Sequence, residues 1–489
     1  MLLLRDEERG AALGRLAERH TRLVRQTHEG EAELPAVHAA KLTATLAAAS
    51  RSALYRHTYD EELRTALWGG QPPDPRTALE EVFPKLPLLA KSELARHGNE
   101  AFTRPLPEFL HYYESSGTTG DPVAAPKAVD DLLINTINIG TLWAQVLRPG
   151  DVALILINAP FAPAAYQFEK VLEYLGVMSL RPWVDNITGD YRRVLRLVGS
   201  LAANVFVGPP SRLLEMIQFA HRHGLATPKF ERLLLMAEQT GPSFVRHLER
   251  LTGGTAYVSS YGSSETGTTA VTCAERGLHL QTQSYLLELA DDSGIRPVDG
   301  SPDRGELVVT TLDLLSRPLL RYRTGDRVEI VADPCPCGVR TPVLRTLGRE
   351  QDVVTLAGNG IRQNDLEAAL WSAPLPDHTV FNYMLVVRDR SVVLLVATDG
   401  EPDTAWCEGL ARRLGPLFTG LTVTVRAVET LPPLASLGQY LGWKLARVLD
   451  LNDEANWGRL PEPVDALVAE SLRRVEEGAA DARRDGGAA

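Results

Sequence analysis

The sequence predicts an α/β protein with a large N-terminal layered domain, a β-rich subdomain and a smaller C-terminal α+β domain. Three observations favour this fold class. A chain of 489 residues is too long for one ordinary hydrophobic core. Strand-like and helix-like segments alternate from about residue 130 to 260, which is typical of layered domains with largely parallel strands. From about residue 305, strands follow one another without long helices.

Individual segments support this organisation. Residues 1–70 are rich in Ala, Leu, Arg and Glu and predict helices, and the glycines and prolines of residues 69–75 end that region. The continuous apolar run 152–157 is typical of a buried parallel strand, and 233–236 predicts another. Ser211 follows two prolines and is expected to cap a helix.

The C-terminal part predicts a small α+β unit. Residues 380–387 and 392–397 are expected to form a hairpin, followed by a helix over 408–417 and a strand over 421–428.

We expect an N-terminal domain over residues 1–350, a C-terminal domain over 351–460, and a last helix with a disordered tail over 461–489.

Composition excludes several classes of protein. The chain has 51 Lys and Arg against 62 Asp and Glu, a net charge of −11, which argues against a nucleic-acid partner. No apolar stretch is long enough for a transmembrane helix, and the run at 1–4 is too short for a signal peptide. Four cysteines in a chain of this size do not indicate a disulfide scaffold, so we expect a reducing cytoplasm and no membrane partner.

One short segment concentrates glycine and hydroxyl residues before an Asp-Pro turn. It contains Ser115, Ser116, Gly117, Thr118, Thr119 and Gly120. Glycines let a backbone approach a ligand closely, and hydroxyl groups suit the oxygens of a polyphosphate. The segment lacks the Gly-Lys-Ser/Thr ending of a P-loop, and a plain flexible loop is the alternative interpretation.

Further motifs follow in a fixed order and, together with this loop, carry a resemblance. They are Leu86-Pro87-Leu88-Leu89-Ala90-Lys91, Ser260 to Gly267, Leu320 to Asp326, Cys335-Pro336-Cys337-Gly338 and Gly348-Arg349-Glu350-Gln351-Asp352. This set resembles the core motifs of the adenylate-forming superfamily, which includes acyl-CoA synthetases, luciferases and the adenylation domains of peptide synthetases. Within that superfamily the likeness is greatest to phenylacetate–CoA ligases. It runs from about residue 40 to about residue 450.

The resemblance implies a set of nucleotide-binding residues. The loop from Ser115 to Gly120 would hold the β- and γ-phosphates of ATP. Ala237 and Glu238 would line the adenine pocket, and the ring of Tyr261, beside Gly262, would stack on adenine. Glu265 would hold Mg²⁺, a role that suits a hard carboxylate oxygen.

Two further residues would contact the sugar and the phosphates. Asp326 would accept hydrogen bonds from the ribose, and Arg349 would add a cationic contact. Each motif also has a structural interpretation, as a tight turn or as solvated surface charges.

The resemblance also implies a catalytic lysine on a mobile lid. The segment Gly442 to Asp450 matches the family element if Trp443 replaces the usual glycine, and Lys444 is then the catalytic lysine. Gln351-Asp352 would be the hinge about which the C-terminal domain rotates. The superfamily usually has a lysine after the second glycine of the phosphate loop, where this chain has Asp121. Lys127 is the substitute that we consider.

Cys273, His279, Cys335 and Cys337 form a candidate set of ligands for a structural Zn²⁺ ion. Phenylacetate–CoA-ligase-like proteins carry a similar arrangement. Cys407 is left outside this set, and buried thiols with a surface histidine are the alternative.

The resemblance places the carboxylic acid beside residues 158–168 and near Gly208. Phe161, Tyr166 and Phe168 can wall an aromatic acid or belong to the core. The family favours aryl and arylacetic acids. Residues 158–163 are rich in proline where the family has glycines, so a substituted benzoate or another specialised acid suits the sequence as well as phenylacetate.

The sequence thus predicts an ATP- and Mg²⁺-dependent ligase that makes an acyl-AMP and passes the acyl group to coenzyme A. A free-standing carrier protein or an amine is the alternative acceptor, and a non-carboxylate adenylating enzyme is another alternative. A non-catalytic nucleotide-binding relative is the alternative of a different class. The identity of the acid stays open, and both a monomer and a homodimer are consistent with the sequence.

Overall fold

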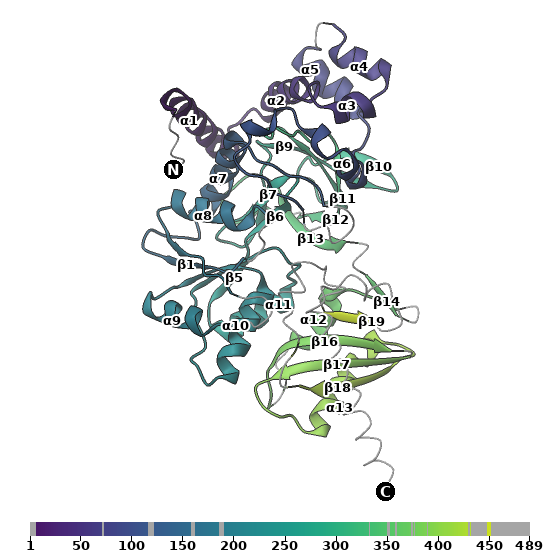
Figure 1. Cartoon of the computed structure of the whole chain (residues 1–489). Coiled ribbons are helices and arrows are strands. Elements are labelled where there is room, and N and C mark those ends of the chain that lie inside the picture. The colour runs from purple at the N-terminus through teal and green to yellow at the C-terminus, as the bar shows by residue number, and fades with distance from the viewer. Residues whose placement is uncertain are drawn as a thin grey trace. The chain divides into compact units, whose positions relative to one another are not determined.

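The structure is a computed structural model. It describes residues 6–70, 73–115, 122–157, 162–184, 190–331, 333–349, 353–356, 359–372, 375, 377–388, 390–428, 431 and 447–450. The chain divides into two compact units (Figure 1). The first unit comprises Met1–Arg181 and Tyr257–Glu350, and the second comprises Pro182–Ala256 and Gln351–Ala489. Among the described residues, no helix combines the length and apolar character needed to cross a bilayer.

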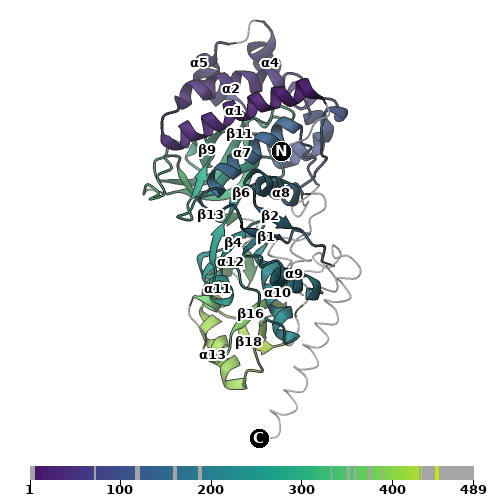
Figure 2. The same cartoon turned by 90° about the vertical axis from the view of Figure 1, so that its left-hand side faces the viewer.

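The first unit begins with helices, as predicted for residues 1–70. Its helices are α1 (Glu7–Glu29), α2 (Leu34–Ala49), α3 (Ala53–Thr58), α4 (Glu61–Trp68), α5 (Pro75–Thr77), α6 (Lys91–His97), α7 (Val129–Trp143) and α8 (Ala164–Tyr174). Asp6 caps α1 by accepting from the Arg9 N–H, and Gly30 ends it with a φ of 77°. Figure 2 shows α1 lying across the face of this unit that turns toward the viewer. The buried helix α7 packs against α1, α8 and strand β7.

An eight-stranded sheet forms the β-rich part of the first unit. Its strands are β6 (Ser260–Ser263), β7 (Gly267–Thr272), β8 (Leu278–Leu280), β9 (Tyr285–Asp291), β10 (Gly294–Pro297), β11 (Asp303–Thr311), β12 (Tyr322–Ile330) and β13 (Val343–Arg349). Their order is β10-β9-β11-β12-β13-β8-β7-β6, and the pairs whose register is known are antiparallel. The strands predicted after residue 305 are confirmed. Leucine and valine side chains of β9, β11 and β12 form the core of this sheet.

A buried arginine ties the Leu-Pro segment of the first unit to this sheet. Arg321 donates from Nε and Nη2 to the two oxygens of Glu288, each at 2.9 Å, and from Nη1 to the carbonyls of Pro84 and Leu86 at 2.8 and 2.7 Å. The N–H of Leu89 then donates to the Arg321 carbonyl at 3.0 Å. These bonds fix where α6 begins, and therefore where Lys91 lies.

Parallel strand pairs occur in both units, as the sequence predicts for an α/β protein. In the first unit β1 (Val152–Ile155) pairs in parallel with β2 (Met178–Leu180). In the second unit β3 (Val205–Gly208) pairs in parallel with β4 (Arg232–Leu235). The apolar runs at 152–157 and 233–236 are therefore confirmed as strands. Strand β5 (Thr255–Val258) contains the boundary between the units.

The second unit combines these strands with the C-terminal elements. Its helices are α9 (Arg192–Ser200), α10 (Pro210–Arg222), α11 (Pro242–Thr252), α12 (Gln363–Trp371) and α13 (Thr404–Leu414). Its C-terminal strands are β14 (Val354–Leu356), β15 (Asn359–Ile361), β16 (Val380–Arg388), β17 (Ser391–Thr398), β18 (Thr422–Ala427) and β19 (Val448–Asp450). The last four form a sheet of order β18-β17-β16-β19, visible in Figure 1 with α12 and α13 beside it.

The elements predicted for the C-terminal part are confirmed, except that one helix begins earlier than expected. The hairpin is β16 with β17, and the strand expected over 421–428 is β18. The helix expected over 408–417 begins earlier, at Thr404, because the Asp403 side chain accepts from the Trp406 N–H. A short 3₁₀ turn, η6 (Gly415–Leu417), follows it. The predicted segment 461–489 lies outside the described residues.

Ser211 does not cap α10, so that prediction is wrong. Helix α10 begins at Pro210, which places Ser211 in its first turn. Its N–H donates to Glu238 Oε2 at 3.2 Å, and its hydroxyl donates to Glu238 Oε1. A carboxylate that follows β4 therefore supplies the acceptor that the first turn of a helix needs.

The predicted boundary at residue 350 coincides with the end of the first unit. The second unit also takes in Pro182–Ala256, a segment that the sequence assigns to the N-terminal domain. The domain boundaries themselves and the mobility of the C-terminal domain stay predictions.

A buried cluster joins α11 to the C-terminal elements of the second unit. The Trp371 ring stacks on His247 with ring centroids 4.4 Å apart. The Arg447 guanidinium lies 4.7 Å from the centroid of the Tyr383 ring, and its Nη1 donates to Asn382 at 2.8 Å. Arg447 is thereby held between aromatic and polar groups, an arrangement that favours a planar cation.

Glu367 is fully buried in the same cluster. Its Oε1 accepts from Gln363 at 2.9 Å and from the Tyr383 hydroxyl at 3.1 Å. Burial raises the pKa of Glu367 from 4.5 to about 7, although the Arg447 charge and these two hydrogen bonds act in the opposite direction. The folded state therefore favours the protonated carboxyl.

This raised pKa predicts a loss of stability with rising pH. The folded pKa exceeds the unfolded one, so the stabilisation is fully present below pH 4.5 and is lost as pH rises through 7. By linkage the difference is on the order of 3 kcal/mol. We expect the melting temperature of Glu367→Gln to depend less on pH in this window than that of the wild type, by calorimetry. The exposed Glu408→Gln is the matched control, and an unchanged pH slope in Glu367→Gln would contradict the assignment.

Candidate active site

Three predicted nucleotide-binding residues meet in the first unit. The Tyr261 hydroxyl donates to Asp326 Oδ2 at 2.8 Å, and Arg349 Nε donates to Asp326 Oδ1 at 2.5 Å. The strands enforce this meeting, because Asp326 on β12 stands opposite Arg349 on β13. Burial, reinforced by the Asp326 charge, raises the pKa of Tyr261 well above its usual value, so the phenol stays a hydrogen-bond donor. Gly262 follows Tyr261 in β6 and is exposed. A Cβ atom at position 262 would lie 2.1 Å from the Gly267 carbonyl oxygen, so the strand pair leaves room only for glycine there.

Glu265 lies in the turn between β6 and β7 and is almost completely buried. Its Oε1 lies 3.2 Å from Lys91 Nζ. This contact is an ion pair without the alignment of a good hydrogen bond. Burial acts to raise the pKa of Glu265, but the Lys91 charge and hydrogen bonds outweigh it and lower the pKa. Glu265 is therefore an ionised carboxylate with a cation beside it.

Two more cations lie against the backbone of this turn. Arg317 Nη2 donates to the Glu265 carbonyl at 2.6 Å, and Lys127 Nζ donates to the Ser264 carbonyl at 2.9 Å. Burial and the Arg317 charge lower the pKa of Lys127 to about 8. The structure thus places Lys127 beside the Glu265 turn. Its suggested replacement of a lysine at position 121 stays a prediction, since Asp121 lies outside the described residues.

A hairpin carries the start of the predicted phosphate loop. The Ser115 N–H donates to the Val123 carbonyl, and the Val123 N–H donates to Ser115 Oγ, both at 2.9 Å. Ser115 is buried at the base of this hairpin. The remaining loop residues, Ser116, Gly117, Thr118, Thr119 and Gly120, lie outside the described residues.

The aromatic groups predicted for the acid pocket separate into two sets. Tyr166 on α8 is half-buried, and its ring centroid lies 4.2 Å from that of His111, which stacks on Tyr113 at 5.6 Å. Phe168 instead is buried and stacks on Trp143 at 5.1 Å, so it belongs to the core. Phe161 lies outside the described residues.

The other predicted pocket residues belong to the second unit. Gly208 ends β3, and Ala237 and Glu238 follow β4, so all three lie at the carboxyl ends of parallel strands. Ala237 has a φ of 67°, which is uncommon for a residue with a Cβ. Burial raises the pKa of Glu238, and its bonds to Ser211 oppose that shift. The catalytic candidate Lys444 and the hinge candidates Gln351 and Asp352 lie outside the described residues.

The cysteine and histidine set converges in the first unit. Cys273 follows β7, His279 lies in β8, and Cys335 and Cys337 precede β13. One ligand atom from each lies within 4.8 Å of all the others. Cys273 Sγ lies 3.6 Å from Cys335 Sγ, and Cys337 Sγ lies 3.2 Å from His279 Nε2. Ligands around tetrahedral Zn²⁺ with bonds of about 2.0–2.3 Å are separated by about 3.3–3.8 Å, so this set fits the ion.

Two neighbouring groups support the same fit. His279 Nδ1 lies 3.0 Å from the Thr341 carbonyl, a contact that places the ring proton on Nδ1 and leaves Nε2 free as a ligand. A Cβ at Gly277 would lie 3.1 Å from Cys335 Sγ, so glycine leaves room for the four ligands. Cys407 lies in α13 and is not a member of this set, as expected.

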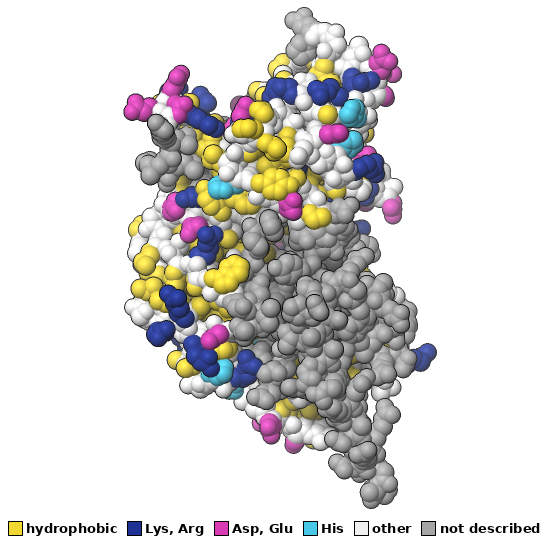
Figure 3. Space-filling view, in the orientation of Figure 1, with side chains coloured by type: hydrophobic (Ala, Val, Ile, Leu, Met, Phe, Trp, Pro, Cys, Tyr) yellow, Lys and Arg dark blue, Asp and Glu magenta, His cyan; other side chains and the backbone are white. Residues whose placement is uncertain are grey.

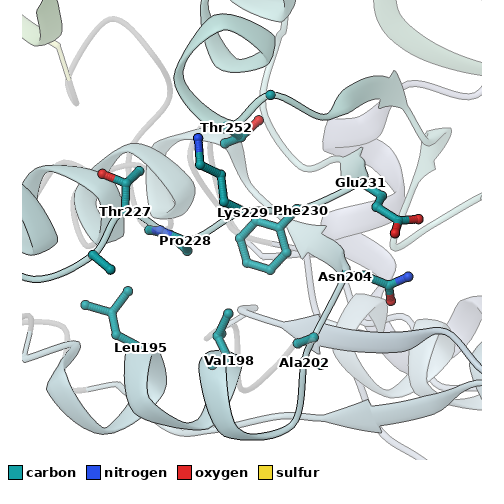
Figure 4. Close-up of a pocket in the computed structure, with 14 residues that line it drawn as sticks. Leu195, Val198, Ala202, Asn204, Thr227, Pro228, Lys229, Phe230, Glu231 and Thr252 are labelled. Atoms are coloured by element: carbon teal, nitrogen blue, oxygen red, sulfur yellow. The ribbon is translucent and has the colours of Figure 1, made fainter.

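One described cavity in the second unit is lined by none of the predicted site residues. It has a volume of about 580 Å³ and opens between α9 and the segment before β4 (Figure 4). Leu195 and Val198 face Pro228 and Phe230 across it, with Lys229 at its edge. Its walls reach the amino ends of β3 and β4. Ligands of parallel α/β sheets bind at the carboxyl ends, so we assign this cavity no part in the reaction.

The sequence did not assign a role to three residues near the site. Lys91 belongs to the Leu-Pro motif, but its contact with Glu265 arises only in the folded protein. Arg317 precedes a recognised motif, and its burial beside Glu265 had no local signal. His111 lies four residues before the phosphate loop, and its stacking on Tyr166 depends on the distant helix α8.

Known proteins share sequence with a large part of this chain. No protein-family model matches the chain. The chain is 28% identical over 349 residues to the phenylacetate-coenzyme A ligase of Thermus thermophilus, covering 69% of this chain and 74% of the relative. It is 24% identical over 376 residues to the enzyme of the same name from Escherichia coli K12, covering 73% and 80%.

Solved structures share the fold. A 2-hydroxyisobutyryl-CoA ligase in its postadenylation state aligns with a TM-score of 0.67 at 18% identity, covering 89% of this chain and 91% of that one. An acyl acid amido synthetase aligns with a TM-score of 0.61 at 15% identity, covering 96% and 98%. The chain is therefore similar in sequence to phenylacetate–coenzyme A ligases, and it shares its fold with adenylate-forming enzymes.

Proposed function

We propose that this protein activates a carboxylic acid with ATP, releases pyrophosphate and transfers the acyl group from AMP to coenzyme A. The observation that carries the proposal is the meeting of Tyr261, Asp326 and Arg349 in the unit that also buries Glu265. The similarity to phenylacetate-coenzyme A ligases supports the same reaction class.

The arrangement suits recognition of a nucleotide. Each oxygen of the Asp326 carboxylate receives one hydrogen bond from the protein and keeps acceptor capacity for ribose hydroxyls. The Arg349 guanidinium lies against this carboxylate, and a carboxylate forms stronger hydrogen bonds than a neutral acceptor. The Tyr261 hydroxyl anchors its ring beside the same carboxylate, which supports the proposed stacking on adenine.

The reaction must bring an anionic carboxylate to an anionic phosphate. Glu265 is the proposed holder of Mg²⁺, which would neutralise phosphate charge when bound. In the described residues Lys91 supplies the cation for Glu265. We infer that Lys91 balances this buried charge before nucleotide binds and turns toward the phosphates afterwards. Its side chain is about one-third exposed, which leaves room for that movement.

The proposed catalytic residue is Lys444, whose ammonium would stabilise negative charge as the carboxylate oxygen attacks the α-phosphorus. The proposed hinge is Gln351-Asp352. Arg447, three residues after Lys444 in the sequence, is anchored in the second unit by Asn382 and the Tyr383 ring.

The proposed acid is aromatic. His111, Tyr113 and Tyr166 form a contiguous aromatic group beside the hairpin that carries the phosphate loop. Such a group offers ring faces to an aryl acid. Coenzyme A is the proposed acceptor, and a carrier-protein thiol or an amine is the alternative that product analysis will separate.

Acid-dependent exchange of labelled pyrophosphate into ATP tests the proposed function. We expect exchange with at least one acid from a panel of aryl and alkyl carboxylates, and an acyl-CoA product by mass spectrometry. Lys444→Ala is expected to lower exchange by roughly 100-fold or more, as the loss of a transition-state contact does. Lys229→Ala, at the edge of the unassigned cavity, is the control. Absence of exchange across the panel would contradict the proposal.

Lys91→Met tests the charge balance at Glu265. Without the ammonium, burial is expected to raise the pKa of Glu265, so the acidic limb of the exchange–pH profile should move to higher pH. Added Mg²⁺ should partly restore activity, because the ion supplies the missing positive charge. Lys85→Met, an exposed residue before the same helix, is the matched control. A profile identical to that of the wild type would show that Lys91 does not govern this carboxylate.

We also propose that Cys273, His279, Cys335 and Cys337 hold a structural Zn²⁺ ion that fastens the β12–β13 loop to β7 and β8. Four protein ligands would leave no open position, so the ion would stabilise the fold and take no part in the chemistry. Burial raises the pKa of the Cys273 thiol to about 12, so zinc binding must displace its proton.

Metal analysis tests this zinc site. At least one equivalent of zinc is expected in protein purified without chelator, with loss of one equivalent and a fall in melting temperature of several degrees in Cys335→Ser. Cys407→Ser is the matched control and should keep the metal. Wild-type protein that lacks stoichiometric metal after zinc-replete expression would refute the site.

A further inference from the structure

A second group of metal-binding side chains lies among the N-terminal helices, separate from the cysteine set. His57 lies in α3, His97 ends α6, and Glu100 lies in the following 3₁₀ turn, η3 (Gly98–Ala101). One ligand atom from each lies within 4.8 Å of the other two. We propose that His57, His97 and Glu100 form a second, solvent-accessible site for a divalent transition metal of the Zn²⁺ type.

The distances match those expected between ligands. Glu100 Oε2 lies 2.7 Å from His97 Nδ1 and 3.4 Å from His57 Nδ1. Ligand atoms of a tetrahedral Zn²⁺ ion with bonds of about 2.0–2.2 Å are about 3.3–3.6 Å apart. The contact between His57 and Glu100 already has this separation. The contact between His97 and Glu100 would have to lengthen by less than about 1 Å, a movement that the exposed Glu100 side chain allows. The Nδ1 atoms of His57 and His97 both face Glu100 Oε2, so the three ligand atoms converge on one place.

The backbone beneath the three side chains is firmly held. Ser52, which precedes α3, donates from Oγ to the Glu100 carbonyl at 2.8 Å. Leu54 and Tyr55 of α3, Leu94 of α6 and Ala101 of η3 are buried in one hydrophobic core. The ligands therefore come from elements already packed together, so metal binding would not have to order the backbone.

The side chains themselves are accessible. Those of His57, His97 and Glu100 are 61%, 21% and 49% exposed. Figure 3 shows histidine side chains gathered on the surface over α3 and α6. A metal ion can therefore enter from solvent, and three protein ligands leave at least one position for water.

The donor chemistry selects the class of ion. Two imidazole nitrogens and one carboxylate oxygen suit Zn²⁺ and its neighbours, whereas Mg²⁺ and Ca²⁺ prefer oxygen alone. The set holds one carboxylate and two imidazoles whose Nδ1 atoms face it, so a metal ion would meet oxygen and nitrogen ligands together.

Cobalt titration of the full-length protein tests the site. Co²⁺ bound to thiolates gives strong charge-transfer absorption in the near ultraviolet, whereas Co²⁺ bound to nitrogen and oxygen gives only weak visible bands. We expect a nitrogen–oxygen type of Co²⁺ site in the wild type, displaced by Zn²⁺. Its affinity should fall at least about tenfold in His97→Gln and in Glu100→Gln.

Controls separate this site from other causes. The exposed His223→Gln should bind Co²⁺ as the wild type does. Circular dichroism and melting temperature establish that each variant is folded. The His57→Gln variant is expected to lose Co²⁺ affinity in the same way. Equal Co²⁺ affinity in the wild type, His97→Gln and Glu100→Gln would overturn the proposal, as would binding confined to the cysteine set. The proposed ligase activity does not enter this test.

Discussion

The buried charge of Glu265 is the constraint on which the candidate site depends. An ionised carboxylate removed from water is costly unless cations lie beside it. Lys91 provides the ion pair, while Arg317 and Lys127 bind the backbone carbonyls of the same turn. These cations come from α6, from the segment before β12 and from the hairpin before α7. Neutralising one carboxylate therefore requires distant parts of the first unit to converge.

The fold prepares this convergence through a second buried ion pair. Arg321 binds Glu288 on β9 and also the carbonyls of Pro84 and Leu86, so the Leu-Pro segment is attached to the sheet. Breaking such a pair leaves a buried charge without a partner. The antiparallel register of β12 and β13 adds Arg349 opposite Asp326. The Arg321 pair thus holds the segment that leads to Lys91, and the strand register holds Arg349 opposite Asp326, so each positions groups that are proposed to meet ATP.

Sequence patterns predicted the parts of this arrangement that are local. The apolar run of β1, the late β-rich segment and the order of motifs each depend on neighbouring residues, and so does the Cys335-x-Cys337 pair. Contacts between distant segments had no such signal. Nothing near Lys91 indicates Glu265 as its partner, and nothing near Ser211 indicates that Glu238 would replace it as the helix cap. Side-chain partners across a fold depend on topology and strand register, which a short pattern does not contain.

The central claim is that a carboxylate oxygen attacks the α-phosphorus of ATP, and isotope transfer measures that bond directly. A carboxylic acid labelled with ¹⁸O in both oxygens is incubated with ATP, Mg²⁺, coenzyme A and the protein. When the thiol attacks the carbonyl carbon, the carbon–oxygen bond to AMP breaks and one labelled oxygen leaves with AMP. The account predicts AMP that is heavier by one ¹⁸O atom. Unlabelled AMP, or ADP formed together with labelled phosphate, would contradict it.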